Sequence, residues 1–125
     1  MYSAGGRENF EQLVTEALAA LPKDLAARMS NVDIVVEDRP KKALARTMEV
    51  DPDRLLGLYQ GVPLTERGEA YFGVLPDKIC LYQDNIERAA YSRNDLKEIV
   101  RRTVIHEVAH HFGISDERLE ELGWA

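Results

Sequence analysis

The sequence predicts a single-domain α+β fold, because helical hydrophobic patterns near both ends of the chain flank several short strand-like segments. A chain of 125 residues suits one domain, and 45% apolar with 30% charged residues is the balance of a globular protein. We expect residues 1–8 to form a flexible N-terminal tail, since Gly5 and Gly6 do not favour order there. Residues 9–125 should then form the domain.

The elements expected before the last third of the chain follow from hydrophobic spacing and turn residues. Apolar side chains recur every three or four residues between Phe10 and Leu21, which predicts an amphipathic helix with Asn9 as its N-cap and Pro22 as its stop. Residues 32–37 are short and β-branched, which predicts a strand. Weaker patterns predict short helices at residues 23–29, 43–49 and 84–91, strands at residues 55–60 and 78–82, and a turn-rich segment at residues 62–68.

The strongest helical pattern starts after Ser92 and ends at Gly113. Ser92 or Asn94 can cap its first turn, and Gly113 suits the left-handed conformation that often ends a helix. Apolar residues occupy several sides of its C-terminal half, so we expect that half to be buried nearly all round. A short acidic helix should follow, capped by Ser115 or Asp116.

The charge and the cysteine content exclude several classes of protein. The 22 acidic residues outnumber the 16 basic ones and give a net charge of −6, so we do not expect a nucleic-acid partner. No apolar stretch approaches the ~18 residues that span a bilayer, and the N-terminus lacks the apolar region of a signal peptide. Cys80 is the single cysteine, so no intramolecular disulfide can form, and we expect a buried, inert thiol. These features predict a cytoplasmic protein without a membrane partner.

Three residues of the long helix carry the functional signal: His106, Glu107 and His110. Residues four apart advance about 400° around a helix, so the two imidazoles leave the same face one turn apart and can reach one metal ion. Glu107 lies about 100° round from His106, close enough to act on a water at that ion but poorly placed to ligate it. The alternative of two core or capping histidines leaves Glu107 as an unfavourable unpaired carboxylate on an apolar helix.

Residues downstream extend the motif to His-Glu-x-x-His-x-x-Gly-x-x-Asp. Gly113 lets the backbone reverse, and Asp116 can then return toward the ion as a third ligand. Two imidazoles, one carboxylate and an open fourth position are the layout of a catalytic zinc site. Asp116 has a structural alternative, which is to cap the final helix, and it can serve both roles. His111 points about 100° away from His110, so we expect it behind the ligands or on the surface.

The segment from His106 to Asp116 resembles the zincin metallopeptidases, in the branch whose third ligand is Asp. It differs from the metzincins, which carry a third His and a later Met-containing turn, because Asp116 takes that place and no methionine follows Met48. Together with the short chain and the segment from Tyr59 to Leu64, the motif resembles the bacterial minimal zincin-like metallopeptidases. That resemblance implies a zincin-like minimal metalloprotease fold, a small mixed sheet flanked by helices, with the motif on the active-site helix.

The residues predict a zinc-dependent metallopeptidase that hydrolyses peptide or protein substrates. His106, His110 and Asp116 are expected to hold one Zn²⁺, which lowers the pKa of a water toward ~7. Glu107 is expected to be the general base, which takes the water proton and passes it to the leaving amine.

The sequence leaves other parts of such a site open. An oxyanion partner is needed, and Tyr82, Tyr91 and Arg93 are candidates among which nothing selects. An extended substrate can pair with an exposed strand edge, either near residues 58–61 or near residues 79–82.

Only nine residues follow Asp116, so the lower wall of the substrate cleft must be thin, absent or completed by another subunit or partner. A homo-oligomer is therefore one expectation, and Trp124 could cover the site, join that interface or pack on the nearest apolar surface. The main alternative function is a zinc-binding protein with a regulatory or partner-dependent role and little proteolysis of its own. A structural or interaction domain with a coincidental motif is the third hypothesis.

Overall fold

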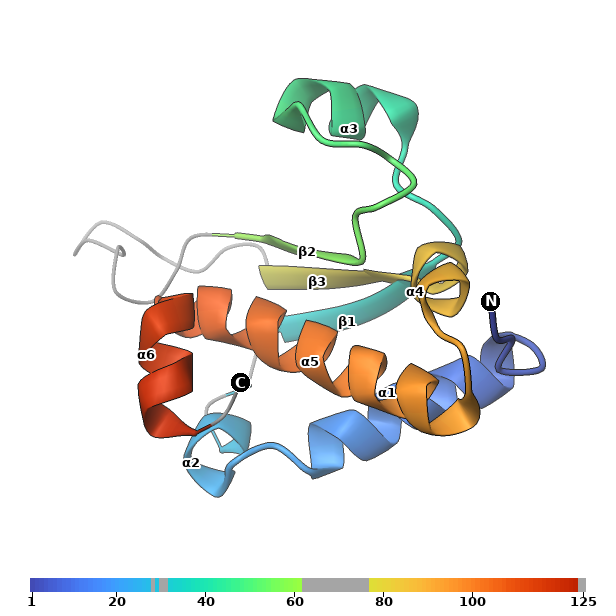
Figure 1. The fold of residues 1–125 in the computed structure, drawn as a ribbon. Helices are drawn as coiled ribbons and strands as arrows, with labels where there is room; N and C mark the ends of the chain where they lie inside the picture. Colours follow the sequence, from blue (N-terminus) through green and yellow to red (C-terminus); the bar gives the residue numbers. More distant parts are fainter. Residues whose placement is uncertain (28, 30–31, 62–76, 124–125) are drawn as a thin grey trace.

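The computed structural model describes residues 1–27, 29, 32–61 and 77–123. It confirms the α+β class, because a three-stranded sheet packs against the two longest helices (Figure 1). The elements in chain order are α1 (Arg7–Ala19), α2 (Lys23–Ala26), β1 (Val32–Glu37), α3 (Lys42–Met48), β2 (Gly57–Gln60), β3 (Asp77–Tyr82), α4 (Gln83–Ala89), α5 (Arg93–Phe112) and α6 (Asp116–Leu122).

The sheet is mixed, with the strand order β1-β3-β2. β1 runs parallel to β3 and places Val32 opposite Asp77, whereas β2 runs antiparallel to β3 and places Tyr59 opposite Ile79. Residues 79–82 of β3 are all buried although successive side chains point to opposite faces of a strand, so both faces of this central strand are covered. α1 and α5 lie along one side of the sheet, and α3 lies on the other side (Figure 1).

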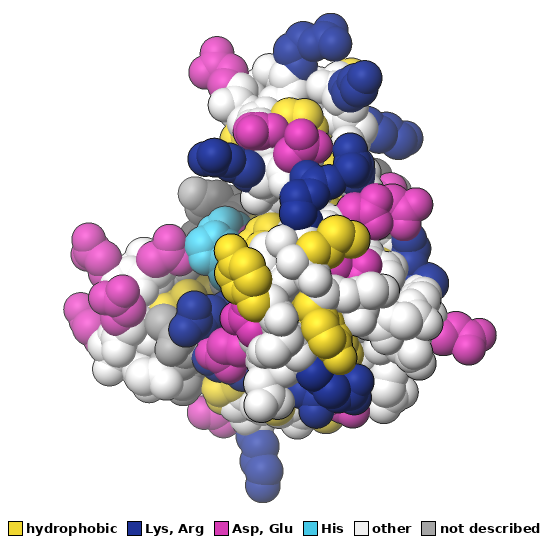
Figure 2. Space-filling view, turned by 45° about the vertical axis from the view of Figure 1, so that its right-hand side comes forward, with side chains coloured by type: hydrophobic (Ala, Val, Ile, Leu, Met, Phe, Trp, Pro, Cys, Tyr) yellow, Lys and Arg dark blue, Asp and Glu magenta, His cyan; other side chains and the backbone are white. Residues whose placement is uncertain are grey.

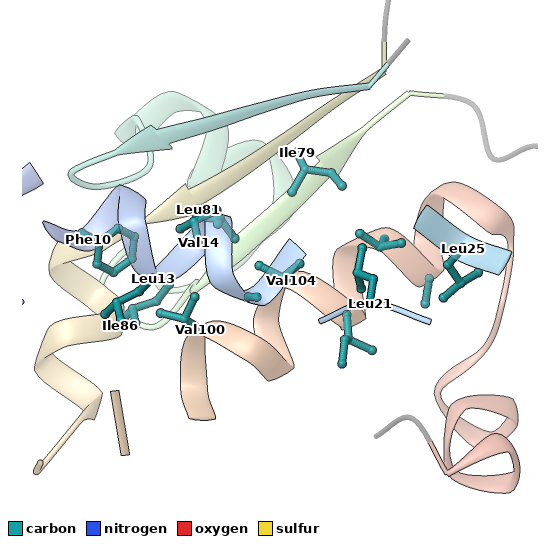
Figure 3. Close-up of a cluster of buried hydrophobic side chains, with 14 of the residues drawn as sticks. Phe10, Leu13, Val14, Leu21, Leu25, Ile79, Leu81, Ile86, Val100 and Val104 are labelled. Carbon is teal, nitrogen blue, oxygen red and sulfur yellow. The ribbon is translucent and has the colours of Figure 1, made fainter. Parts of the chain in front are cut away.

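The core lies where α1 and α5 pack against the sheet (Figure 3). The spacing expected for the first helix puts its apolar side chains on one stripe, and that stripe is buried. The C-terminal half of α5 is buried on several sides, as its sequence predicted, because it packs against both α1 and the sheet. The fully buried side chains of this core include Phe10, Leu81, Ile86, Val100 and Val108.

Local interactions fix both ends of α5. The Ser92 hydroxyl accepts a hydrogen bond from the Asp95 backbone N–H at 3.1 Å, so Ser92 is the N-cap of the two residues that the sequence allowed. Gly113 follows the last turn with a φ of 71°, a left-handed conformation that glycine adopts most easily. Ser115 caps α6 in the same way, by accepting from the Arg118 N–H at 3.2 Å. These caps hold the segment that carries the motif.

The first helix begins earlier than the sequence predicted. α1 already begins within the segment predicted as tail, and its N-cap is Gly6 rather than Asn9. The backbone N–H groups of Tyr2 and Ala4 donate to the carbonyl and the carboxylate of Glu87, at 3.0 and 2.6 Å. These bonds tie the first residues to α4, and the local sequence could not show them because Ala4 and its partner are 83 residues apart.

Three expectations concern parts of the chain that lie outside the described residues. They are the turn-rich segment at residues 62–68, the end of the segment from Tyr59 to Leu64, and the placement of Trp124. Each of them stays a prediction.

The structure also bears on the expectations for Cys80 and for membrane-spanning helices. Cys80 is buried, as expected, and this burial, together with the neighbouring Glu37, raises the pKa of the thiol to about 11. The thiol is therefore protonated and unreactive at neutral pH. Across the described ranges, no helix combines the length and the apolar character needed to cross a membrane.

Replacing the N-cap of α5 should lower stability measurably. Ser92→Ala removes the acceptor for the Asp95 N–H, and we expect the free energy of unfolding to fall by about 1 kcal/mol in urea denaturation. Ser92→Asp supplies another acceptor, so this control should retain most of the stability. An equal loss in both variants would contradict the cap.

Candidate metal centre

His106 and His110 lie one turn apart on the same side of α5, as their spacing predicted. Their ring centroids are 4.4 Å apart and their planes meet at 62°. The two side chains are 42% and 45% exposed, so neither ring is packed into the core. Figure 2 shows a histidine side chain that reaches the surface beside an acidic one. This exposure excludes the alternative of two core histidines.

The Glu107 carboxylate lies near both imidazoles and is almost fully buried, with 6% of its side chain exposed. Its Oε1 is 3.3 Å from His110 Nδ1, and its Oε2 is 3.7 Å from His106 Nε2. Ligand atoms of the three residues all lie within 4.8 Å of one another. Imidazole nitrogens are donors that suit Zn²⁺, and the carboxylate lies close enough to act on a water at an ion held by both rings, so this group fits one divalent cation. The carboxylate is closer to both rings than its angular separation along the helix suggested.

Asp116 lies next to His106, but it is not part of the group that His106 forms with Glu107 and His110. It is the first residue of α6, and its Oδ1 lies 2.9 Å from His106 Nδ1. When Nδ1–H donates to this carboxylate, Nε2 of His106 keeps the lone pair that binds metals. The structure therefore shows Asp116 as a partner of a predicted ligand, and its own role as a third ligand stays a prediction. The capping role falls to Ser115 instead.

Strand β2 supplies a part of the site that the sequence did not reveal. The Tyr59 backbone N–H donates to Glu107 Oε1 at 2.8 Å, so the strand also holds the carboxylate. β2 can approach α5 this closely because Gly57 has no side chain: a Cβ there would lie 2.8 Å from Thr103 Cγ2 and 3.3 Å from Glu107 Cγ. A glycine in a strand-like run is a sign of close backbone approach, but nothing in the sequence identifies the partner helix.

His111 is buried, which excludes the surface position that was one of its two expected places. The residue is 2% exposed, and its Nδ1 is 2.5 Å from Oδ2 of Asp77, a carboxylate that is equally buried. The Tyr59 hydroxyl donates to the same Oδ2 at 2.7 Å. Asp77 was not among the expected site residues, because no local pattern links the start of a strand to a helix 34 residues away.

A cavity of about 640 Å³ opens beside this group, between the β2, α5 and α6 segments. His106, Glu107 and Asp116 line it together with apolar side chains that include Leu56 and Leu119. Leu119 belongs to α6, so the few residues after Asp116 do supply a wall of the cleft. A volume of this size is in the range of small-molecule and peptide side-chain sites.

The three candidates for an oxyanion partner do not line this cavity. Tyr91 and Arg93 lie at the first turn of α5, and at 1.5 Å of rise per residue about 20 Å of helix separates Arg93 from His106. Tyr82 is 1% exposed, and its burial raises the pKa of the phenol. None of these three residues is therefore placed to stabilise an oxyanion beside the histidines.

A family model described as zincin-like metallopeptidase matches residues 29–124. The chain belongs to this zincin-like metallopeptidase family. The membership confirms the resemblance drawn from the segment between His106 and Asp116. A solved structure, described as a conserved hypothetical protein from Thermus thermophilus, is 25% identical to this zincin-like chain; the match has a TM-score of 0.56 and covers 93% of this chain and 95% of that one. The comparison with curated proteins gave no match.

The close approach of β2 to α5 in this zincin-like protein can be tested at Gly57. Gly57→Ala places a Cβ 2.8 Å from the Thr103 methyl and 3.2 Å from the Cys80 carbonyl oxygen, so we expect a loss of about 1–3 kcal/mol in the free energy of unfolding. Thr103→Ser removes that methyl and keeps the hydroxyl that donates to the Ile99 carbonyl. The double variant should recover part of the loss in urea denaturation, and strict additivity of the two single changes would argue against the contact.

Proposed function

We propose that this zincin-like metallopeptidase is a zinc-dependent peptidase that acts on peptide or protein substrates. The observation that carries the proposal is the group of His106, Glu107 and His110, whose ligand atoms lie within 4.8 Å of one another beside a cavity. Solvent-exposed imidazoles next to a buried carboxylate are the components that metal-assisted hydrolysis needs. Family membership supports the same class of reaction.

Each side chain has a defined part in this reaction. His106 and His110 would hold the ion, and Asp116 would complete the set or orient His106, which it contacts. Bound Zn²⁺ supplies a Lewis acid that polarises a peptide carbonyl and acidifies a water. Glu107 takes the proton of the attacking water and passes it to the leaving amine. The Tyr59 N–H already donates to Oε1, so we expect Oε2 to be the oxygen that takes the proton.

An extended substrate would pair with β2 rather than with β3. Among the strands of the described residues, β3 has a neighbour on each side, whereas β2 lies at one end of the order. The Tyr59 N–H points away from β3, because it donates to Glu107 instead. A peptide that pairs with other backbone groups along β2 passes next to the general base, while the Tyr59 N–H stays bonded to Glu107.

Zinc binding should depend on the two exposed histidines. We expect one Zn²⁺ per wild-type chain in metal analysis after dialysis, and loss of that ion in His106→Ala and in His110→Ala. Asp116→Ala should weaken zinc affinity by about 10–100-fold in a chelator competition, whether the carboxylate ligates or orients His106. Asp24→Ala changes an exposed acid on α2 and should bind like the wild type. Unchanged zinc content in both histidine variants would remove the metal site from the proposal.

Peptide cleavage should depend on Glu107, although zinc binding should not. Glu107→Gln removes the proton acceptor and keeps the shape of the side chain, so we expect cleavage to fall by about 10²–10⁴-fold with zinc content unchanged. The assay is mass spectrometry of the products of a broad peptide library, which also reports the cleavage preference. Glu8→Gln, an exposed change on α1, is the matched control.

Three outcomes separate this proposal from its alternatives. Zinc-dependent cleavage that Glu107→Gln abolishes supports the peptidase. Stoichiometric zinc without cleavage of the library would point to a metal-binding protein with a regulatory or partner-dependent role. Cleavage that survives Glu107→Gln unchanged would show that another group is the general base.

A further inference from the structure

We propose that Tyr59, Asp77 and His111 form a positioning network that holds the Glu107 carboxylate in place. The inference builds on the proposed function, because a held general base matters only where Glu107 acts as one. Its evidence is a chain of hydrogen bonds that runs from the buried side of α5, through the sheet, to the exposed site.

The network joins α5 to the two strands that face it. His111 directly follows the predicted ligand His110, and its Nδ1 lies 2.5 Å from Oδ2 of Asp77, the first residue of β3. The hydroxyl of Tyr59, in β2, donates to the same oxygen at 2.7 Å. The Tyr59 ring also stands edge-on to His111, with ring centroids 5.8 Å apart. A single carboxylate oxygen thus ties three elements together.

Burying this network costs free energy unless each of its polar groups has a hydrogen-bond partner. Asp77 and His111 are each 2% exposed, and a carboxylate withdrawn from water needs donors that replace its hydration. An apolar set of similar volume often stabilises a fold as well as a buried ionic set does, or better. The network is therefore weak evidence for stability alone, and its value lies in what it positions.

What the network positions is the backbone of Tyr59. β2 has only four residues, and the ends of a short strand open locally more easily than its centre. The anchor on Asp77 fixes the Tyr59 side chain, while the N–H of the same residue donates to Glu107 Oε1 at 2.8 Å. Tyr59 therefore links the buried pair to the carboxylate that acts in the site.

Gly61 shows how closely this network is packed. A Cβ at that position would lie 2.6 Å from Asp77 Oδ1 and 2.8 Å from the Tyr59 hydroxyl oxygen, which are distances that Cβ atoms do not show. Glycine is therefore the residue that lets the two groups meet. Such tight packing gives the Tyr59 hydroxyl one defined position, as a positioning role requires.

The first test reads the residue 59 amide directly and needs no substrate. In ¹⁵N-labelled wild-type protein we expect this amide proton to lie downfield and to exchange slowly, because its acceptor is a carboxylate. Glu107→Ala should remove both signatures. Tyr59→Phe, which lacks only the hydroxyl, should speed exchange at residue 59 by about tenfold while the β3 amides stay protected. Tyr91→Phe is the matched control, because Tyr91 is 85% exposed.

A rescue experiment distinguishes hydrogen bonding from packing at His111. His111→Asn keeps a side-chain N–H donor close to the place of Nδ1, whereas His111→Leu fills similar space without a donor. We expect the residue 59 amide to stay protected in the Asn variant and to lose protection in the Leu variant. The same amide behaviour in both variants would reduce His111 to a packing residue and remove it from the network.

The second test measures kinetics on a substrate found with the peptide library. Tyr59→Phe should lower kcat by about 10–100-fold, with KM and zinc affinity within about twofold of the wild-type values. An unchanged residue 59 amide in this variant would overturn the network, whatever the kinetics show. A wild-type protein that cleaves nothing would overturn the peptidase proposal instead, and the amide measurements would still decide whether the network holds Glu107.

Discussion

A charged group withdrawn from water needs donors around it, and in this protein that need ties strand β2 to helix α5. The Glu107 carboxylate is almost fully buried, and it accepts the Tyr59 N–H while two imidazoles also lie close to it. The donor can reach it because Gly57 removes the side chain that would hold strand and helix apart. β2 in turn is paired to β3 at the centre of the sheet. The sheet therefore positions Glu107 as well as covering the hydrophobic core.

Helix α5 uses its three histidines in two different environments, and their angular positions explain the difference. His106 and His110 share one face and stay nearly half exposed, which keeps their nitrogens accessible to a metal ion. His111 is turned about 100° away, into the space between helix and sheet, where Asp77 compensates its burial. The end of α5 thus presents two candidate ligands to solvent, and the residue after the second of them anchors the helix to the sheet.

The sequence was informative where the governing interactions are local. Hydrophobic spacing and capping chemistry predicted α5 from Ser92 to Gly113, and the four-residue spacing predicted that two imidazoles share a face. The parts that the sequence did not predict depend on partners far along the chain. Tyr59 and Glu107 are 48 residues apart, and Asp77 and His111 are 34 apart. Such pairs are set by how strands and helices pack, and neither periodicity nor turn residues encode that packing.

The short segment after the motif does more than its length suggested. Ser115 takes the cap of α6, so the Asp116 carboxylate does not serve as the cap and lies 2.9 Å from His106 instead. One turn later Leu119 is buried and lines the cavity, so the same helix that presents the acid also closes one side of the cleft. A second subunit is therefore not needed to explain that wall, and the homo-oligomer stays a separate prediction. Strand β2, helix α5 and helix α6 each contribute both a wall of the cavity and a contact to the side chains of the candidate metal site.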